Sequence, residues 1–138
     1  VNVEGFVLGE NGSTQFVAWS TVRVNNKIAL QLFNEDDQKK ISDKPNENSF
    51  AVAKGKGYTF YAIATCAVRL IQAVFSDARL YASVSAYDPE YKTYIGYPAI
   101  IGSDGIEQLV ELKLTEDEHN KLTASANKIK KHLKELKK

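Results

Sequence analysis

The sequence predicts one α+β domain in which antiparallel β-hairpins pack against a buried central helix and a C-terminal amphipathic helix. Three observations predict it. β-Prone segments occur in pairs around turn residues. Residues 60–75 are apolar on nearly every side, which is typical of a helix surrounded by protein. Residues 115–136 combine a capping sequence with apolar side chains at helical spacing. A chain of 138 residues with 43% hydrophobic and 25% charged residues fits a single globular domain.

A turn near the N-terminus brings glycines and polar residues together. Gly9 and Gly12 bracket Glu10 and Asn11, and an apolar run follows directly. Glycine permits positive φ or a close approach of another backbone, so the two polar side chains would project from a tight connection. The same pattern of glycine and polar residues also fits an ordinary turn between two strands. The pattern therefore leaves a structural turn and a site-bearing turn open.

The next segment predicts a hairpin. Residues 16–19 and 21–24 are β-prone, Asn25-Asn26 tolerates positive φ, and residues 28–30 return toward the first strand. We expect the order strand, turn, strand.

Two helical segments occupy the middle of the chain. Residues 34–48 are polar, and Pro45 removes a backbone donor that a helix needs, so we expect a short helix that stops or kinks near Lys44. Residues 60–75 predict the buried central helix, and Cys66 within them is expected to pack in the core.

The C-terminal half predicts strands and a final helix. Residues 80–85 are typical of a strand, and residues 93–101 and 106–114 flank a turn rich in glycine and polar residues. Thr115 and Glu118 form the N-cap and N3 positions of a capping box. The helix that follows is acidic at its start and rich in lysine at its end, which is the order that the helix dipole favours.

Charge and composition exclude several classes of function. The formal net charge of +1 gives no field that would attract nucleic acid or an anionic membrane, and no apolar run reaches the length of a membrane span. His119 and His132 lie more than three turns apart on one helix, so we expect surface residues and no metal site. The single cysteine excludes an intrachain disulfide and favours a reducing, cytoplasmic location. A nucleotide-binding glycine motif is missing, because residues 55–57 are too short to form one.

Several ordered motifs resemble the L-lactate/malate dehydrogenase family, and within it most closely the L-2-hydroxyisocaproate dehydrogenases. These motifs are GFVLGENGS (5–13), QFVAWSTVRV (15–24), GKGYT (55–59) and YPAIIG (97–102) with the following DG pair. In that family a dinucleotide-binding Rossmann domain precedes a substrate domain, and residues 1–138 resemble the second. The resemblance implies that the NAD-binding domain is absent from this chain, which would account for the missing phosphate motif.

The resemblance also implies site residues. The family's Gly-Glu-x-Gly turn carries at x a histidine that donates a proton to the 2-oxo group of the substrate, and this sequence has Asn11 there. A carboxamide donates a hydrogen bond but supplies no proton at neutral pH, and a positioned acid or base contributes about 10²- to 10⁴-fold. The implied substrate pocket comprises Ser49, Phe50, Ala53 and Thr59, and the implied contact with the nicotinamide is Ile63.

A purely structural reading of these residues stays open. Thr59 would then cap the central helix, and Phe50 and Ile63 would lie in the core. Pro45 also falls in a segment that is helical in the family and packs at its subunit interface. A proline there argues against that helix and against the family's usual oligomer.

Two hypotheses follow. In the first, the chain is the substrate domain of an NAD-dependent L-2-hydroxyacid dehydrogenase, acts on a small 2-oxo or L-2-hydroxy acid, forms a homo-oligomer, and neither binds NAD nor catalyses turnover by itself. Its pocket would prefer a branched aliphatic substrate. In the second, Asn11 marks a protein that kept the fold and lost the chemistry, and that serves as a binding or oligomerisation module.

Overall fold

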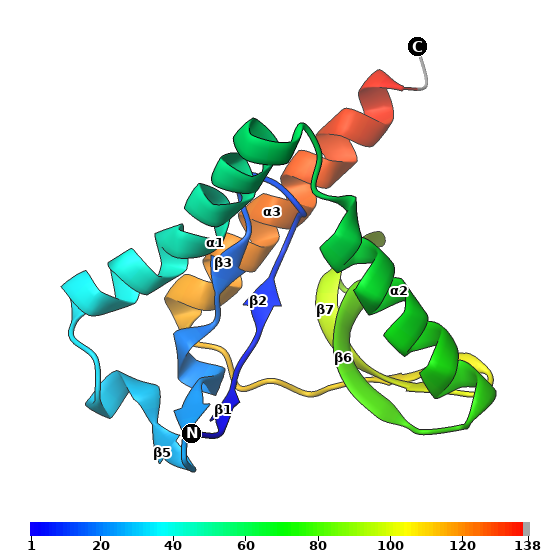
Figure 1. Ribbon diagram of the computed structural model, residues 1–138, viewed down its shortest axis with the longest axis horizontal. Coiled ribbons are helices and arrows are strands. Elements are labelled where there is room, and N and C mark those ends of the chain that lie inside the picture. Colours follow the sequence, from blue (N-terminus) through cyan, green and yellow to red (C-terminus); the bar gives the residue numbers. More distant parts are fainter. Residues whose placement is uncertain (137–138) are drawn as a thin grey trace.

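The computed structural model describes residues 1–136, apart from the side chain of Asn46. Within them it contains the helices α1 (Glu35–Lys56), α2 (Phe60–Phe75) and α3 (Glu116–Glu135), together with small antiparallel sheets. Figure 1 shows α2 beside the curved hairpin of β6 (Leu80–Asp88) and β7 (Thr93–Gly102), whereas α1 lies on the opposite side of the view. Helix α3 contacts β7. The predicted α+β class with antiparallel hairpins is confirmed.

The strands form three sheets among the described residues. The first has the order β1 (Val3–Glu4), β4 (Arg23–Val24), β5 (Lys27–Ile28), and the second pairs β2 (Val7–Leu8) with β3 (Phe16–Val17). The third has the order β6 (Leu80–Asp88), β7 (Thr93–Gly102), β8 (Gly105–Leu109). An isolated bridge between Gly9 and Gly96 joins the end of β2 to β7.

The predicted turn at Asn25-Asn26 is confirmed, because both residues have positive φ, 48° and 65°, and connect β4 to β5. The expectation that residues 16–19 and 21–24 form one arm of a hairpin is wrong. The N–H of the buried Ala18 donates to the carbonyl of Phe6 and so extends the register of the β2–β3 pairing by one residue. The backbone then turns through a 3₁₀ segment, η1 (Trp19–Thr21), in which the N–H of Thr21 donates to the carbonyl of Ala18.

The hairpin of β6 and β7 is longer than the sequence pattern predicted. It pairs Leu80 with Ile101 at one end and Asp88 with Thr93 at the other. Asp88 Oδ1 accepts the backbone N–H of Glu90 at 2.8 Å, which closes the turn. The strand expected over residues 106–114 is shorter than predicted, because β8 ends at Leu109 and residues 110–114 form no strand.

The helix expected within residues 34–48 is confirmed, but it does not stop near Lys44, because α1 is one helix of 22 residues that runs through Pro45. Asn34 caps its start by accepting the N–H of Asp37 at 2.9 Å, and Gly57 ends it with φ of 81°. Proline inside a helix costs about 3 kcal/mol. Strong caps at both ends and acidic residues in the first turn offset that loss, so the helix continues.

Helix α3 begins as predicted. Thr115 Oγ1 accepts the N–H of Glu118 at 3.2 Å, and the Glu118 carboxylate accepts the N–H of Thr115 at 2.9 Å. The same carboxylate accepts the N–H of Ser20 at 2.9 Å, so the capping box also attaches the helix to the segment after β3.

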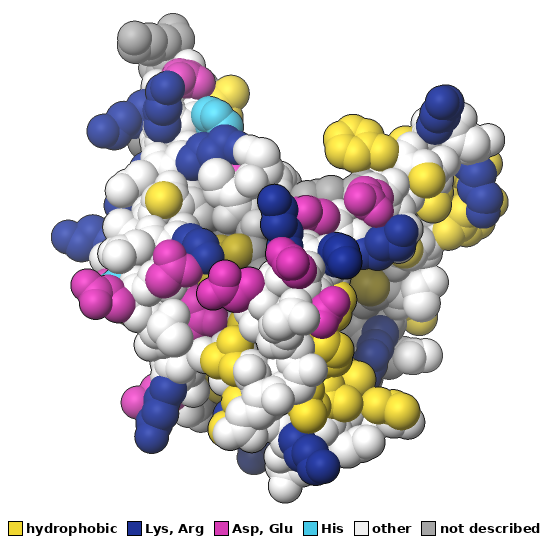
Figure 2. All heavy atoms as spheres, turned by 90° about the vertical axis from the view of Figure 1, so that its left-hand side faces the viewer, with side chains coloured by type: hydrophobic (Ala, Val, Ile, Leu, Met, Phe, Trp, Pro, Cys, Tyr) yellow, Lys and Arg dark blue, Asp and Glu magenta, His cyan; other side chains and the backbone are white. Residues whose placement is uncertain are grey.

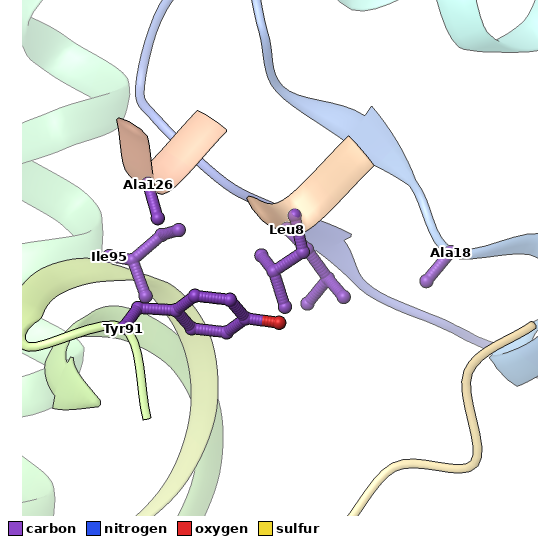
Figure 3. Packing of buried hydrophobic residues seen from close by; sticks show 6 residues of the cluster. Leu8, Ala18, Tyr91, Ile95 and Ala126 are labelled. Carbon is purple, nitrogen blue, oxygen red and sulfur yellow. The ribbon is translucent and has the colours of Figure 1, made fainter. Parts of the chain in front are cut away.

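The core lies between α3, β2 and the start of β7 (Figure 3). Its buried cluster consists of Leu8, Ala18, Tyr91, Ile95, Leu122 and Ala126. Leu8 and Ile95 are each 1% exposed and come from segments about ninety residues apart in the chain. The N-terminal strand is therefore held in place by long-range packing rather than by its own short pairing.

The prediction that α2 is buried is wrong for this domain. Among its described residues only Ala73 is buried, whereas Ile63 is 67% exposed and Phe75 88%. Cys66, expected in the core, is exposed as well. One side of α2 contacts β7, and nothing within the described chain covers the others. An all-round apolar pattern indicates that a helix needs covering, and it does not show that the same domain supplies the cover.

Candidate functional site

The Gly9–Gly12 turn is fixed to β7 by close backbone contact. The N–H of Gly9 donates to the carbonyl of Gly96 and the N–H of Gly96 donates to the carbonyl of Gly9, both at 2.9 Å. Gly9 has φ of 100°, and a Cβ on Gly96 would lie 2.5 Å from the Gly9 carbonyl oxygen. Only glycine allows the two backbones this approach without strain. The turn is therefore positioned by the hairpin that follows about ninety residues later.

A second set of contacts attaches the turn to α3, and we name its residues, Glu10, Thr14, Ser125 and Lys128, the Glu10 clamp. Ser125 Oγ accepts the N–H of Glu10 at 2.6 Å. The Glu10 carboxylate accepts the hydroxyl of Thr14 at 2.5 Å and forms an ion pair with Lys128 Nζ at 2.9 Å. The Glu10 side chain is 17% exposed, so this ion pair is partly shielded from water.

The electrostatics of the clamp favour the charged form of Glu10. The hydroxyl of Thr14 and then the ammonium group of Lys128 lower the pKa of Glu10, whereas partial burial opposes them. Hydrogen bonds and an opposite charge both stabilise a carboxylate. Glu10 is thus a fixed anion that orients the turn, and its chemistry is unsuited to taking up a proton.

Asn11 is exposed at the tip of the turn, where two hollows meet. One, of about 400 Å³, lies between the turn, β6 and β7 and includes Ser85 and Tyr94. The other, also about 400 Å³, lies between the turn and α1, and we name it the turn–α1 hollow. Its lining residues are Asn11, Gly12, Ser13, Gln15, Pro45, Ser49 and Phe50.

The structure brings some of the predicted site residues together. Ser49 and Phe50 share the turn–α1 hollow with Asn11, although they lie almost forty residues away in the sequence. Ala53, on the same helix, and Thr59 and Ile63 are not among the residues that line it. The alternative core roles are wrong for Phe50, which is 77% exposed, and for Ile63. Thr59 precedes α2, but its side chain accepts no N–H from that helix.

Sequence reasoning missed the residues that hold the turn. Ser125 and Lys128 lie three positions apart on α3 and so face the same way. Lysine on an amphipathic helix usually lies on the solvated face, so the pattern gave no indication of a role for Lys128. The available signal was Ser125, a polar residue three positions after Leu122 and four before Ile129, on the apolar face of the helix.

In residues 1–136, no group of three or more His, Cys, Asp or Glu side chains lies close enough to hold a metal ion. No single helix there has the length and apolarity to cross a membrane; α1 and α2, which are bent by 116° relative to each other, meet that criterion only when counted together.

Comparison with known proteins gives a family. Residues 1–138 match the family described as lactate/malate dehydrogenase, alpha/beta C-terminal domain. The chain is 33% identical over 141 residues to an L-lactate dehydrogenase of Pediococcus acidilactici, covering 96% of this chain and 44% of that protein. It is 36% identical over 146 residues to L-lactate dehydrogenase 3 of Bacillus anthracis, covering 98% and 46%.

A solved structure is also similar. The crystal structure of a lactate dehydrogenase from a Medee basin deep-sea metagenome library matches with a TM-score of 0.93 and 29% identity, over 99% of this chain and 47% of that one. The chain thus spans less than half the length of these relatives. The chain belongs to the lactate/malate dehydrogenase family and corresponds to its C-terminal domain.

Proposed function

We propose that this chain is the substrate domain of an NAD-dependent L-2-hydroxyacid dehydrogenase, which interconverts a 2-oxo acid and an L-2-hydroxy acid. The observation that supports it is the placement of Asn11 at the tip of a rigidly held turn, beside a hollow that it shares with Ser49 and Phe50. The curated relatives are L-lactate dehydrogenases, so lactate is one candidate substrate. A branched hydroxy acid such as 2-hydroxyisocaproate is the other.

Asn11 would orient the substrate rather than transfer a proton to it. Its side-chain N–H₂ donates hydrogen bonds, and the substrate 2-oxo group accepts them. The Glu10 clamp holds the turn so that this donor is fixed without reorganisation. The proton that completes reduction has to come from another group, so we expect slow turnover with asparagine at this position.

The substrate side chain would lie along α1. Phe50 offers an exposed aromatic surface, and Ser49 beside it offers a hydroxyl. We further propose that Ala53 and Thr59 extend this lining when the remainder of the pocket is present. A mostly apolar lining with few polar groups suits a branched aliphatic substituent.

NAD would reach this domain at α2. Ile63 is a branched aliphatic side chain that is 67% exposed, which suits the face of a planar nicotinamide ring. When bound, NAD supplies or accepts the hydride of the reaction. Its other contacts would come from a nucleotide-binding domain, so we expect residues 1–138 alone to bind neither NADH nor NAD⁺ and to leave 2-oxoisocaproate and pyruvate unreduced.

A chimeric enzyme tests this function. The nucleotide-binding half of the Pediococcus acidilactici L-lactate dehydrogenase is joined to residues 1–138, with either Asn11 or Asn11→His. We expect the substitution to raise kcat/KM for 2-oxo acids by about 100-fold or more, which corresponds to about 2.7 kcal/mol of transition-state stabilisation. Steady-state NADH oxidation measures it.

The controls are NADH binding, which reports the nucleotide-binding half, and thermal unfolding of both chimeras, which shows that residues 1–138 are folded as well. A folded chimera that binds NADH and gains nothing from Asn11→His would contradict the proposed function. Turnover of 2-oxo acids by residues 1–138 alone would also contradict it, because the proposal requires a nucleotide-binding domain for activity.

The second candidate function is a binding or oligomerisation module. Two observations favour it, namely the asparagine at position 11 and the apolar side chains exposed on α2. On α2, Ile63 is 67% exposed and Phe75 88%. Figure 2 shows the side of the domain away from α2, where hydrophobic side chains also lie at the surface among acidic and basic ones. Large exposed apolar areas mark interaction surfaces. We propose a homo-oligomer under either function, and sedimentation velocity of the chain tests it; the cytoplasmic location stays a prediction.

A further inference from the structure

We propose that Asn11 is a site of spontaneous deamidation, at which the Asn11-Gly12 pair passes through a cyclic imide and ends as aspartate or isoaspartate at position 11. The inference is independent of the proposed dehydrogenase function, because it concerns the chemistry of the turn itself. Three observations carry it: the residue that follows Asn11, the exposure of its side chain, and the local backbone.

The reaction needs only water. The backbone nitrogen of Gly12 gives up its proton and attacks Cγ of Asn11, forming a new N–Cγ bond in a five-membered ring. The bond from Cγ to the side-chain nitrogen breaks, and that nitrogen leaves as ammonia with the proton. Water then opens the ring. Attack at Cγ restores the normal main chain and leaves aspartate, whereas attack at the Asn11 main-chain carbonyl leaves isoaspartate, with the chain continuing through Cβ.

The sequence makes this site unique. Asn11-Gly12 is the one Asn-Gly pair of the chain, and the other asparagines are followed by residues with side chains. A Cβ on the following residue crowds the attacking nitrogen, and glycine removes that crowding. Glycine also gives the backbone the freedom to bring its nitrogen toward Cγ.

The structure leaves the reacting groups accessible. The Asn11 side chain is exposed and forms no hydrogen bond with the residues that the structure describes. The N–H of Gly12 donates to the carbonyl of Glu10 at 2.8 Å, within a three-residue turn. Such a turn is local and lies outside any helix or strand ladder, so opening it disturbs no regular structure.

Other asparagines are held more firmly. Asn25 Oδ1 accepts the N–H of Asn2 at 2.9 Å, and Asn34 Oδ1 accepts the N–H of Asp37. Asn48 lies inside α1 and Asn127 inside α3, where the N–H of the next residue belongs to the helical hydrogen bonding. Their backbone nitrogens cannot reach Cγ without unwinding a turn of helix.

Deamidation would change the candidate site. It adds a negative charge next to Glu10, whose carboxylate oxygen lies within 2.7 Å of where a Cβ on Gly12 would be. The isoaspartate product also lengthens the main chain between Gly9, which is attached to Gly96 of β7, and Thr14, whose hydroxyl lies 3.0 Å from Ser125 Oγ of α3. The neutral amide would thereby be replaced by a carboxylate, and the turn would loosen from α3.

Peptide mapping by mass spectrometry tests the proposal on the 138-residue chain. The folded chain is incubated at neutral and mildly alkaline pH, in parallel with a sample unfolded in urea that reports the intrinsic reactivity. We expect the Asn11 peptide to convert before every other asparagine peptide, at least about tenfold faster, to a mixture rich in isoaspartate. Its rate in the folded chain should lie within about tenfold of the unfolded rate.

Two matched variants complete the experiment. Asn11→Gln lengthens the side chain by one methylene, which disfavours the five-membered ring. The earliest acidic species, which is the deamidated form that appears first, should therefore disappear. Asn48→Gln removes an asparagine from α1 and should leave that species unchanged. The proposal is overturned if another asparagine converts first, or if folding slows Asn11 by much more than tenfold relative to the urea sample. Persistence of the earliest acidic species in Asn11→Gln would also overturn it.

Discussion

The Gly9–Gly12 turn and helix α2 each carry a residue of the implied site, Asn11 and Ile63, and the domain holds the two elements in different ways. The turn is attached to β7 through Gly96 and to α3 through the Glu10 clamp. Helix α2 contacts β7 along one side and leaves Ile63 and Phe75 exposed. The turn is therefore complete within residues 1–136, whereas the surface of α2 is not.

This difference shows which features depend on further protein. A group positioned by hydrogen bonds and buried neighbours keeps its geometry when the domain stands alone. An exposed apolar helix face gains its place only when another surface covers it. The three predictions that follow test this contrast, in order of decreasing expected effect.

The largest effect is expected from removing core packing beneath the turn. Leu8 is 1% exposed, and Leu8→Ala should lower the free energy of unfolding by about 2–5 kcal/mol, because it leaves a cavity between β2 and α3. Ile63→Ala on α2 should change it by less than about 0.5 kcal/mol. Urea unfolding of the isolated chain measures both. Equal losses in the two variants would show that α2 is as well packed as the turn.

The second prediction concerns the close backbone approach. Gly96→Ala places a Cβ 2.5 Å from the carbonyl oxygen of Gly9 and should destabilise the fold by about 1–3 kcal/mol. Gly55→Ala is the matched control, since a Cβ there meets nothing within 4 Å and the residue lies in α1. It should stabilise the helix by about 0.5–1 kcal/mol. Thermal unfolding compares them, and a neutral Gly96→Ala would argue against a fixed bridge.

The smallest effect is expected from the clamp and depends on pH. Thr14→Val removes the hydroxyl that does most to lower the pKa of Glu10, and it should cost about 1 kcal/mol near neutral pH. Thr65→Val is the control, because that hydroxyl donates to the carbonyl of Tyr61 within α2.

The direction of the pH dependence follows from the lowered pKa. Folded Glu10 binds a proton less readily than unfolded Glu10, so its stabilising contribution is complete above the ordinary glutamate pKa of about 4.3 and is lost as the pH falls through the lower, folded value. Thr14→Val should reduce this acid-dependent loss, measured as unfolding midpoints between neutral and acidic pH. A pH dependence that is the same in Thr14→Val and Thr65→Val would remove Glu10 as its source.

Local sequence signals predicted the ends of elements well. The capping box at Thr115 and the paired asparagines at 25 and 26 act through hydrogen bonds and backbone preferences within a few residues, so their outcome is nearly independent of the rest of the fold. Pro45 is also a local signal, and it misled because caps at residues 34 and 57, rather than the proline, decide where α1 starts and ends.

Motif resemblance implied Asn11, Ser49 and Phe50 as site residues, and the structure brings these three together along one hollow. It could not indicate Ser125 and Lys128, because the contact of α3 with the turn joins residues more than a hundred positions apart, and a lysine on an amphipathic helix reads as a surface residue. The roles of Asn11, Ser49 and Phe50 stay predictions, as do those of Ala53, Thr59 and Ile63.

The sequence by itself determined the fold class, the family and the asparagine at the tip of the turn, because these depend on local pattern and residue identity. Only the tertiary structure decided which apolar segments form the core and what fixes the turn. The apolar residues all round α2 indicate that other protein has to cover this helix, and the amphipathic pattern of α3 indicates that one of its faces is buried. Which surface meets which is set by long-range packing and by the backbone approach of Gly9 to Gly96, and neither of these is written in a local stretch of sequence.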